Sequence, residues 1–188
     1  MDISTTYLGL PLRSPLVVGS CGPLSEDINY LRQMEDAEAG AVVLHSLFEE
    51  QLEKDRFEID FYLSKGTENY PKARAYFQKQ PLFHISAETY LEHITAAKNI
   101  VDIPIIASLN GSTMGGWTTA AEQIEGAGAD ALELNLYAMP TDIGCSSESV
   151  EKAYIDIVKA VSYAVYIPVA VKLSSYFSNI GHFTHRLS

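Results

Sequence analysis

The sequence predicts an α/β fold, a (β/α)₈ TIM barrel of which about the first five βα units are present. Five short runs rich in β-branched and aliphatic residues recur along the 188 residues, each bounded by Pro or Gly. Segments with helical periodicity lie between most of these runs. Polar residues follow nearly every run, at the strand end where (β/α)₈ enzymes build their active sites.

The expected strands are continuous apolar runs, which is typical of parallel strands covered on both faces. They lie at residues 16–20, 41–45, 105–109, 131–135 and 169–173. Helices are expected at residues 30–37, 90–101, 118–125 and 150–165, the second and fourth with a clear apolar stripe. A further helix begins in the closing HFTHRLS, and a long insertion separates the second strand from the helix at 90–101.

Two kinds of joint between elements occur twice. The segment MEDAEAGAVVLHS at 34–46 has the layout of IEGAGADALELNL at 124–136: helix end, Ala/Gly turn, buried strand, polar residue. KNIVDIPIIASL and SYAVYIPVAVKL both place an Ile-Pro pair directly before a strand. A repeated unit of helix, tight turn and strand predicts a parallel sheet, either closed as a barrel or open and doubly wound.

The first strand-to-helix turn favours the barrel. Its sequence, SCGPLSED, lacks G-x-G-x-x-G, and nothing else in the sequence matches a dinucleotide or P-loop fingerprint. The opening YLGLPLRSPL suits a hairpin that plugs the bottom of a barrel. Because complete barrels need about 200 to 250 residues, residues 1–188 are expected to hold part of a single barrel domain.

Composition restricts the partners. The net charge of −11 disfavours nucleic acid and anionic membranes as partners of the whole molecule. No basic leader or membrane-length apolar run is visible, and two cysteines suit a reducing compartment, so we expect a cytoplasmic protein. Cys21 is expected to be buried and Cys145 to be incidental. The histidines lack partners at metal spacing, so we expect no metal.

Five segments, in this order, resemble the class 1-like branch of the dihydroorotate dehydrogenase family. They are SPLVVGSCGPL, GAVVLHSLFEEQ, YLEHITAAKNIVDIPIIASLNG, ALELNLYAMPTD and IPVAVKLSSYFSN, and the likeness runs from about Tyr7 to Asn179. The resemblance implies an FMN-dependent barrel oxidoreductase that acts on a CH–CH group, oxidising dihydroorotate to orotate in pyrimidine biosynthesis. Residues 1–188 would then be the N-terminal part of that FMN-dependent dehydrogenase-type domain.

The resemblance also implies flavin contacts at the strand ends. The family's Lys-Ser or Lys-Thr pair on the second strand corresponds to His45 and Ser46, so its lysine is not kept, and His45 is the candidate stand-in donor. Lys172 is the candidate cation for the charge that develops on the reduced flavin. The full set of expected cofactor contacts is Gly19, Ser20, His45, Ser46, Ser108, Asn135 and Lys172.

The catalytic base of class 1 enzymes is missing from this resemblance. The family carries it on the cysteine of an Asn-Leu-Ser-Cys-Pro-Asn segment, and here Ala138 occupies that position. The family's second-loop substrate motif is not recognisable between Phe48 and Tyr90. The charged stretch at 48–60 reads as a solvated helix face with pairs such as Glu50 and Lys54, and with the residues to Phe83 as a lid or oligomer contact.

Two other functions compete with a flavin oxidoreductase. One is a catalytically inactive fragment or pseudoenzyme, because the phosphate site of the last barrel strands is not among these residues and the chain alone is expected to be inactive. The other is a Schiff-base aldolase-type barrel that uses Lys172. Five strands also leave an open sheet edge, so the isolated chain is expected either to be poorly soluble or to associate through that edge as a homo-oligomer.

Overall fold

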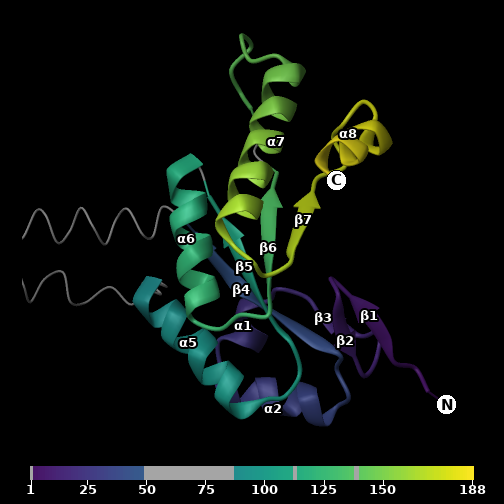
Figure 1. Ribbon diagram of the computed structural model, residues 1–188, viewed down its shortest axis with the longest axis vertical. Coiled ribbons are helices and arrows are strands. Elements are labelled where there is room, and N and C mark those ends of the chain that lie inside the picture. The colour runs from purple at the N-terminus through teal and green to yellow at the C-terminus, as the bar shows by residue number, and fades with distance from the viewer. Residues whose placement is uncertain (1, 49–86, 112–113, 138–139) are drawn as a thin grey trace, which may run out of the picture.

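The computed structural model describes residues 2–48, 87–111, 114–137 and 140–188. Its centre is a five-stranded parallel sheet in the order β3-β4-β5-β6-β7 (Figure 1). The strands are β3 (Val17–Val18), β4 (Ala41–Phe48), β5 (Ile105–Asn110), β6 (Ala131–Leu136) and β7 (Val169–Leu173). Neighbours in sequence are neighbours in the sheet, and the sheet curls, so the predicted partial (β/α)₈ barrel is confirmed.

Helices follow the strands close to the predicted positions. Side-chain caps fix three helix starts: Asp27 accepts from the Asn29 amide, Ser146 from the Ser149 amide, and Asn179 from the His182 amide. The helices are α1 (Gly22–Ser25), α2 (Ile28–Asp36), α5 (Ala87–Ile100), α6 (Met114–Gly126), α7 (Ser147–Ala164) and α8 (Ile180–Leu187). The short α1 was not predicted.

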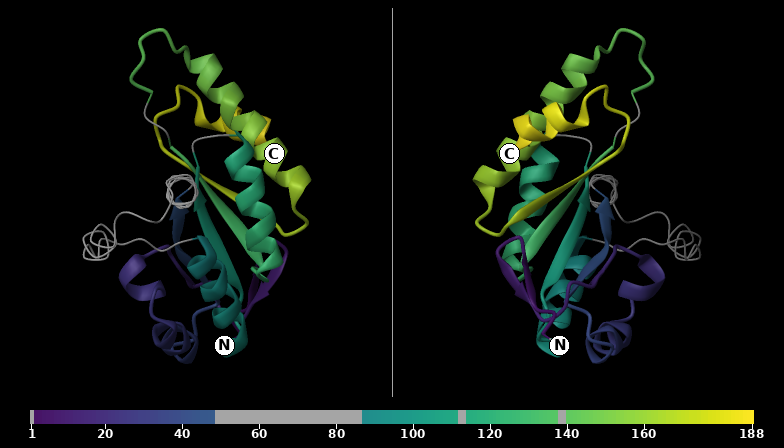
Figure 2. Two further views of the ribbon diagram at one scale, coloured as in Figure 1. Left: turned by 90° about the vertical axis from the view of Figure 1, so that its left-hand side faces the viewer. Right: turned by 90° about the vertical axis from the view of Figure 1, so that its right-hand side faces the viewer.

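The helices cover one face of the sheet, which we call the outer face (Figure 2). Alternate strand residues point to this face and are almost fully excluded from solvent, as Val42, Leu109 and Leu132 show. They pack against the apolar stripes of the helices, including Ile94 of α5 and Val161 of α7. The main hydrophobic core therefore lies between the sheet and its helices.

The opposite, inner face is apolar only near the bottom, where the strands begin. There lies the antiparallel hairpin of β1 (Thr5–Tyr7) and β2 (Leu10–Leu12) (Figure 1). Leu12 of this hairpin packs against Val43, Ile106 and Ala131. The predicted hairpin at the bottom of the barrel is confirmed. The upper inner face, toward the carboxyl ends of the strands, is left for polar side chains.

The joint of helix end, tight turn and strand has the same geometry in both of its copies. Glu38 and Gly128 both adopt positive φ, 65° and 96°, and each amide donates to the carbonyl three residues earlier. Glu35 Oε1 then accepts from the amides of Asp102 and Ile103, before β5.

In the second copy of this unit, Glu125 Oε1 accepts from the amides of Tyr166 and Ile167, before β7. Each glutamate thus clamps a helix end to the start of a later strand. The repetition seen in the sequence reflects a repeated structural unit.

The structure differs from the sequence prediction at Cys21. Both cysteines are free and exposed, so the expectation that Cys21 is buried is wrong; it lies on the turn between β3 and α1, outside the apolar layers. Residues 49–86, with the Glu50–Lys54 pair and the lid or oligomer contact, lie outside the described residues, as does Ala138. None of the helices that the structure describes is long and apolar enough to cross a membrane.

Candidate functional site

A network of polar side chains occupies the upper inner face of the sheet. Ser46 Oγ on β4 lies 2.8 Å from Ser108 Oγ on β5 and 3.4 Å from Ser20 Oγ, which follows β3. Asn135 on β6 donates from Nδ2 to Ser108 Oγ at 2.9 Å and to the Leu109 carbonyl at 3.2 Å. The structure thus brings four of the predicted contact residues together.

Asn135 has an unused hydrogen-bond acceptor within this network. Its Nδ2 group makes every contact just described, whereas its Oδ1 atom is buried and has no hydrogen-bond partner in the described part of the chain. Leaving a buried carbonyl oxygen unpaired costs free energy, about 1 to 3 kcal/mol. Such an atom is available to a ligand that offers an N–H group.

An ion pair extends the network to β7. Lys172 Nζ lies 2.6 Å from Glu133 Oε1, and Ser108 Oγ lies 3.4 Å from the same oxygen. The Glu133 side chain is 16% exposed and that of Lys172 43%. The predicted Lys172 therefore joins the other residues through a carboxylate that sequence reasoning missed.

The signal that could have found Glu133 is its spacing from Asn135. Residues two apart on a strand point to the same face, so a strand that presents Asn135 inward also presents Glu133 inward. The register places Glu133 opposite Ala170 and Asn135 opposite Lys172, so Lys172 reaches diagonally to its partner.

Tyr90 of α5, on the outer face, binds the backbone of Ser108, the central residue of the network. Its hydroxyl accepts from the Ser108 amide at 3.1 Å and donates to the Ser108 carbonyl at 3.3 Å. Burial raises the pKa of Tyr90, so the hydroxyl keeps its proton. The backbone of Ser108 is thereby fixed while its side chain points inward.

The structure does not bring His45 to this network. A β-bulge in β4 inserts one extra residue, since Val43 pairs with Ile106 and Ser46 pairs with Ser108. Strict alternation from Val43 would put His45 on the inner face; the extra residue puts Ser46 there instead. Of the two predicted neighbours, Ser46 therefore faces the inner side and His45 does not.

His45 lies instead among α1 and α5. Its amide donates to Ser25 Oγ at 2.8 Å, and its ring lies 5.1 Å from the Tyr90 ring and 5.5 Å from the His93 ring, between centroids. Both ring nitrogens are buried without partners among the described residues. Burial, and secondarily the nearby His93, lowers the pKa of His45 to about 4, so the ring is neutral at physiological pH.

Space remains beside the network. A methyl group built on Gly19 would meet no atom within 4 Å. A hollow of about 440 Å³ lies between the hairpin and the inner face of the sheet. Its lining includes Val17, Gly19, Val43 and Glu133. The predicted Gly19 thus borders open volume on the inner face.

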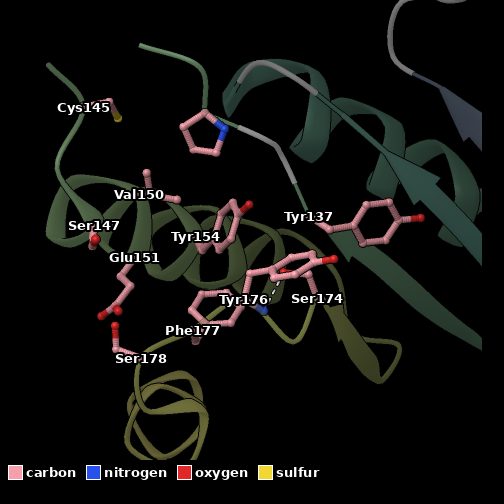
Figure 3. A pocket seen from close by; sticks show the side chains of 11 residues that line it. Tyr137, Cys145, Ser147, Val150, Glu151, Tyr154, Ser174, Tyr176, Phe177 and Ser178 are labelled. Carbon is pink, nitrogen blue, oxygen red and sulfur yellow. Dashed lines mark hydrogen bonds between the residues drawn. The ribbon is translucent and has the colours of Figure 1, made fainter. Parts of the chain in front are cut away.

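A second cavity, which we call the rim pocket, lies where β6 and β7 end (Figure 3). It measures about 720 Å³. Tyr137 follows β6 directly and Ser174 follows β7 directly, so the pocket begins two residues beyond Asn135 and Lys172. Its lining residues are Tyr137, Pro140, Cys145, Ser147, Val150, Glu151, Tyr154, Ser174, Tyr176, Phe177 and Ser178.

The inner-face network combines hydroxyl groups, an amide with a free acceptor, and one ammonium–carboxylate pair. This donor set suits a flat polar ring system with both hydrogen-bond donors and acceptors. It does not suit a metal ion: in the described ranges, no three His, Cys, Asp or Glu side chains meet in an arrangement able to hold one.

Comparison by sequence gives one informative relative. No family model matches the chain. The catalytic subunit of dihydroorotate dehydrogenase B (NAD(+)) from Thermoplasma volcanium is 30% identical over 184 residues, which cover 95% of this chain and 56% of that protein. The chain spans about half the length of the curated relative it matches.

Comparison by structure gives barrel enzymes. The old yellow enzyme homologue from Zymomonas mobilis superposes with a TM-score of 0.57 at 10% identity, covering 92% of this chain and 62% of that one. A dihydrodipicolinate synthase from Agrobacterium tumefaciens superposes with a TM-score of 0.56 at 18% identity, covering 92% and 50%. At these identities the likeness supports the barrel fold alone.

Proposed function

We propose that this chain is the N-terminal part of an FMN-dependent (β/α)₈ oxidoreductase of the dihydroorotate dehydrogenase type, with an altered or lost catalytic base. The observation that carries the proposal is the inner-face network, to which β4 to β7 and the turn after β3 each contribute a polar side chain. The sequence similarity to a dihydroorotate dehydrogenase catalytic subunit supports the same family.

The residues present fit the isoalloxazine ring of a flavin. That ring carries an N–H donor beside several oxygen and nitrogen acceptors. Asn135 Oδ1 is a buried acceptor in need of a donor, and the hydroxyl of Ser20, at the end of the chain of hydroxyls, can donate to a ring acceptor. Gly19 leaves room for a ring face. These residues, with Lys172, would hold the cofactor.

When bound, FMN would supply the hydride acceptor of the reaction. The role of Lys172 would be electrostatic, because a cation at the ring edge stabilises the negative charge of the reduced state. Glu133 would hold the Lys172 ammonium group at a fixed position through the 2.6 Å contact. Its own negative charge would moderate that stabilisation.

Proton abstraction is where this chain departs from class 1 enzymes. Ala138, whose methyl group cannot accept a proton, occupies the position of the family's base. We therefore propose that the standard proton abstraction from dihydroorotate is not carried by this loop. Replacing Ala138 with Cys in a longer form that completes the barrel should restore dihydroorotate oxidation if the base is all that is missing.

The Schiff-base alternative has weaker support. A lysine nucleophile needs a free amine lone pair, and Lys172 is in direct contact with the Glu133 carboxylate. Borohydride treatment with a carbonyl substrate, followed by mass spectrometry of the Lys172 peptide, decides the matter. A labelled peptide would favour the aldolase function over the flavin one.

The direct test is FMN binding to the purified 188-residue chain. We expect flavin fluorescence to change on titration, with a visible band near ~450 nm that stays with the protein during gel filtration. Asn135→Ala should weaken FMN binding about tenfold or more, whereas Asn99→Ala, on the exposed side of α5, should not change it. A folded chain that binds no FMN would show that these 188 residues alone form no working flavin site. The same result for a longer form that completes the barrel would contradict the proposal and favour a pseudoenzyme.

A further inference from the structure

The rim pocket has an aromatic floor that is packed in place. The Phe177 ring stacks on Phe183 of α8 with centroids 4.5 Å apart and planes at 15°. Tyr154 of α7 lies 6.3 Å from each of these two rings. The three rings join the loop after β7 to both helices, so the floor of the pocket is held from two sides.

Two further rings border the pocket but are open to solvent. Tyr137 is 48% exposed and Tyr176 is 89% exposed (Figure 3). Figure 3 shows the Tyr176 ring next to Ser174, whose hydroxyl accepts from the Tyr176 amide at 3.4 Å. Exposed aromatic rings beside a cavity, at the strand ends of a barrel, provide stacking surfaces for a planar ligand.

The charge of the pocket disfavours an anion. Of the described residues that line it, Glu151 alone carries a charge at neutral pH, and it is paired with Arg186 at 3.1 Å. The other polar groups of the lining are hydroxyls and a thiol. The chain as a whole carries a net charge of −11. An uncharged ring with polar edge groups suits this lining better than a carboxylate does.

We propose that the rim pocket binds the substrate of the flavin site, and that this substrate is a planar, uncharged ring compound rather than a carboxylate anion such as dihydroorotate. The inference rests on the proposed function, because Tyr137 and Ser174 of the pocket come two residues after Asn135 and Lys172 of the network proposed to hold FMN. It adds the class of substrate. Tyr176 supplies the stacking surface, and Ser174, which also lines the pocket, supplies a hydroxyl group for the polar edge of the ring.

A matched pair of probes tests the charge preference. Orotate and its neutral carboxamide, orotamide, differ by one charge and little in size. Their dissociation constants for the flavin-free 188-residue chain can be measured by ligand-observed NMR. We expect orotamide to bind at least about threefold more tightly than orotate. Equal or tighter binding of orotate would overturn the proposal.

Two tyrosines with equal exposure test the location. Tyr163 lies on α7, outside the rim pocket, and is 89% exposed like Tyr176. Tyr176→Ala should weaken orotamide binding about 3- to 10-fold, Tyr176→Phe should keep most of it, and Tyr163→Ala should leave it unchanged. Equal affinities of the wild type and Tyr176→Ala would overturn the assignment.

The two proposals fail separately. If the chain binds orotamide through Tyr176 but neither it nor a longer form that completes the barrel binds FMN, the flavin function is contradicted while the ligand class of the pocket stands. If the chain binds FMN but Tyr176→Ala has no effect on orotamide, the flavin function stands and the pocket assignment is contradicted.

Discussion

The two faces of the sheet use the same strands for opposite purposes. On the outer face, residues such as Leu134 are completely buried against helices. On the inner face, the very next residue, Asn135, belongs to a polar network with a spare acceptor. Because side chains alternate along a strand, one buried segment supplies both stability and a binding surface. Stability and function should therefore respond separately to changes one residue apart.

Neighbouring substitutions on β6 should give the largest contrast. Leu134→Ala is expected to lower the free energy of unfolding by about 3 kcal/mol, because it leaves a cavity in the outer core. Asn135→Ala should cost about 1 kcal/mol and abolish most FMN binding. Urea unfolding and FMN titration of both variants measure the two effects. Equal losses of stability would contradict the division between the faces.

Lowering the pH should reduce the free energy of unfolding, because His45 is buried in its neutral form. The folded protein takes up a proton on His45 only near pH 4, whereas the unfolded chain does so near its ordinary value of 6.5. The contribution of His45 to stability is therefore complete above pH 6.5 and is lost as the pH falls toward 4, by up to ~3 kcal/mol.

Urea unfolding of the wild type and His45→Leu at pH 7.5 and 5.0 isolates this effect from the titration of the carboxylates. The residues that face the His45 ring are His93 and Tyr90, and both are kept in the variant. The wild type should lose more stability than His45→Leu over this range. Parallel losses would show that His45 is not responsible.

Charge on the inner face should change binding more than stability. Glu133→Gln removes the negative partner of Lys172, whose side chain is partly exposed, so the free energy of unfolding should fall by less than about 1 kcal/mol. The reduction potential of bound FMN should rise by about 10 to 20 mV, because the Lys172 charge is no longer offset. A lower potential in a dye-equilibrium titration would contradict this assignment of charge.

Substitution of Ser20, at the edge of the network, should have the smallest effect on stability and on FMN binding. Ser20 is half-buried and its hydroxyl lies 3.4 Å from Ser46, so Ser20→Ala should change the free energy of unfolding by less than about 0.5 kcal/mol. FMN affinity should fall about twofold, far less than for Asn135→Ala. A loss equal to that of Asn135→Ala would place the centre of the site at β3 rather than at β6.

The fold followed from local signals. Apolar runs marked the strands, the repeated joints marked the parallel order, and YLGLPLRSPL marked the hairpin. These features depend on short stretches of sequence, so one sequence was enough to predict them. The ends of strands also gave Ser20, Ser46, Ser108, Asn135 and Lys172, which the structure brings into one network.

What escaped prediction depends on pairing between distant segments. The bulge in β4 that turns His45 outward is defined only by its register with β5. Glu133 forms its contact with Lys172, 39 positions away, and within ALELN it resembles an isolated charge in a buried strand. Local sequence patterns contain neither piece of information.

Glu35 and Glu125 make the same hydrogen bonds at the starts of two strands, although the sequence separations differ. Their bonded groups are 67 and 41 positions away in the sequence, yet both clamps have the same form. The start of β5 and the start of β7 are therefore each held to a preceding helix end in the same way. For protein engineering, Glu35 and Glu125 are the positions to keep when either unit is shortened or extended.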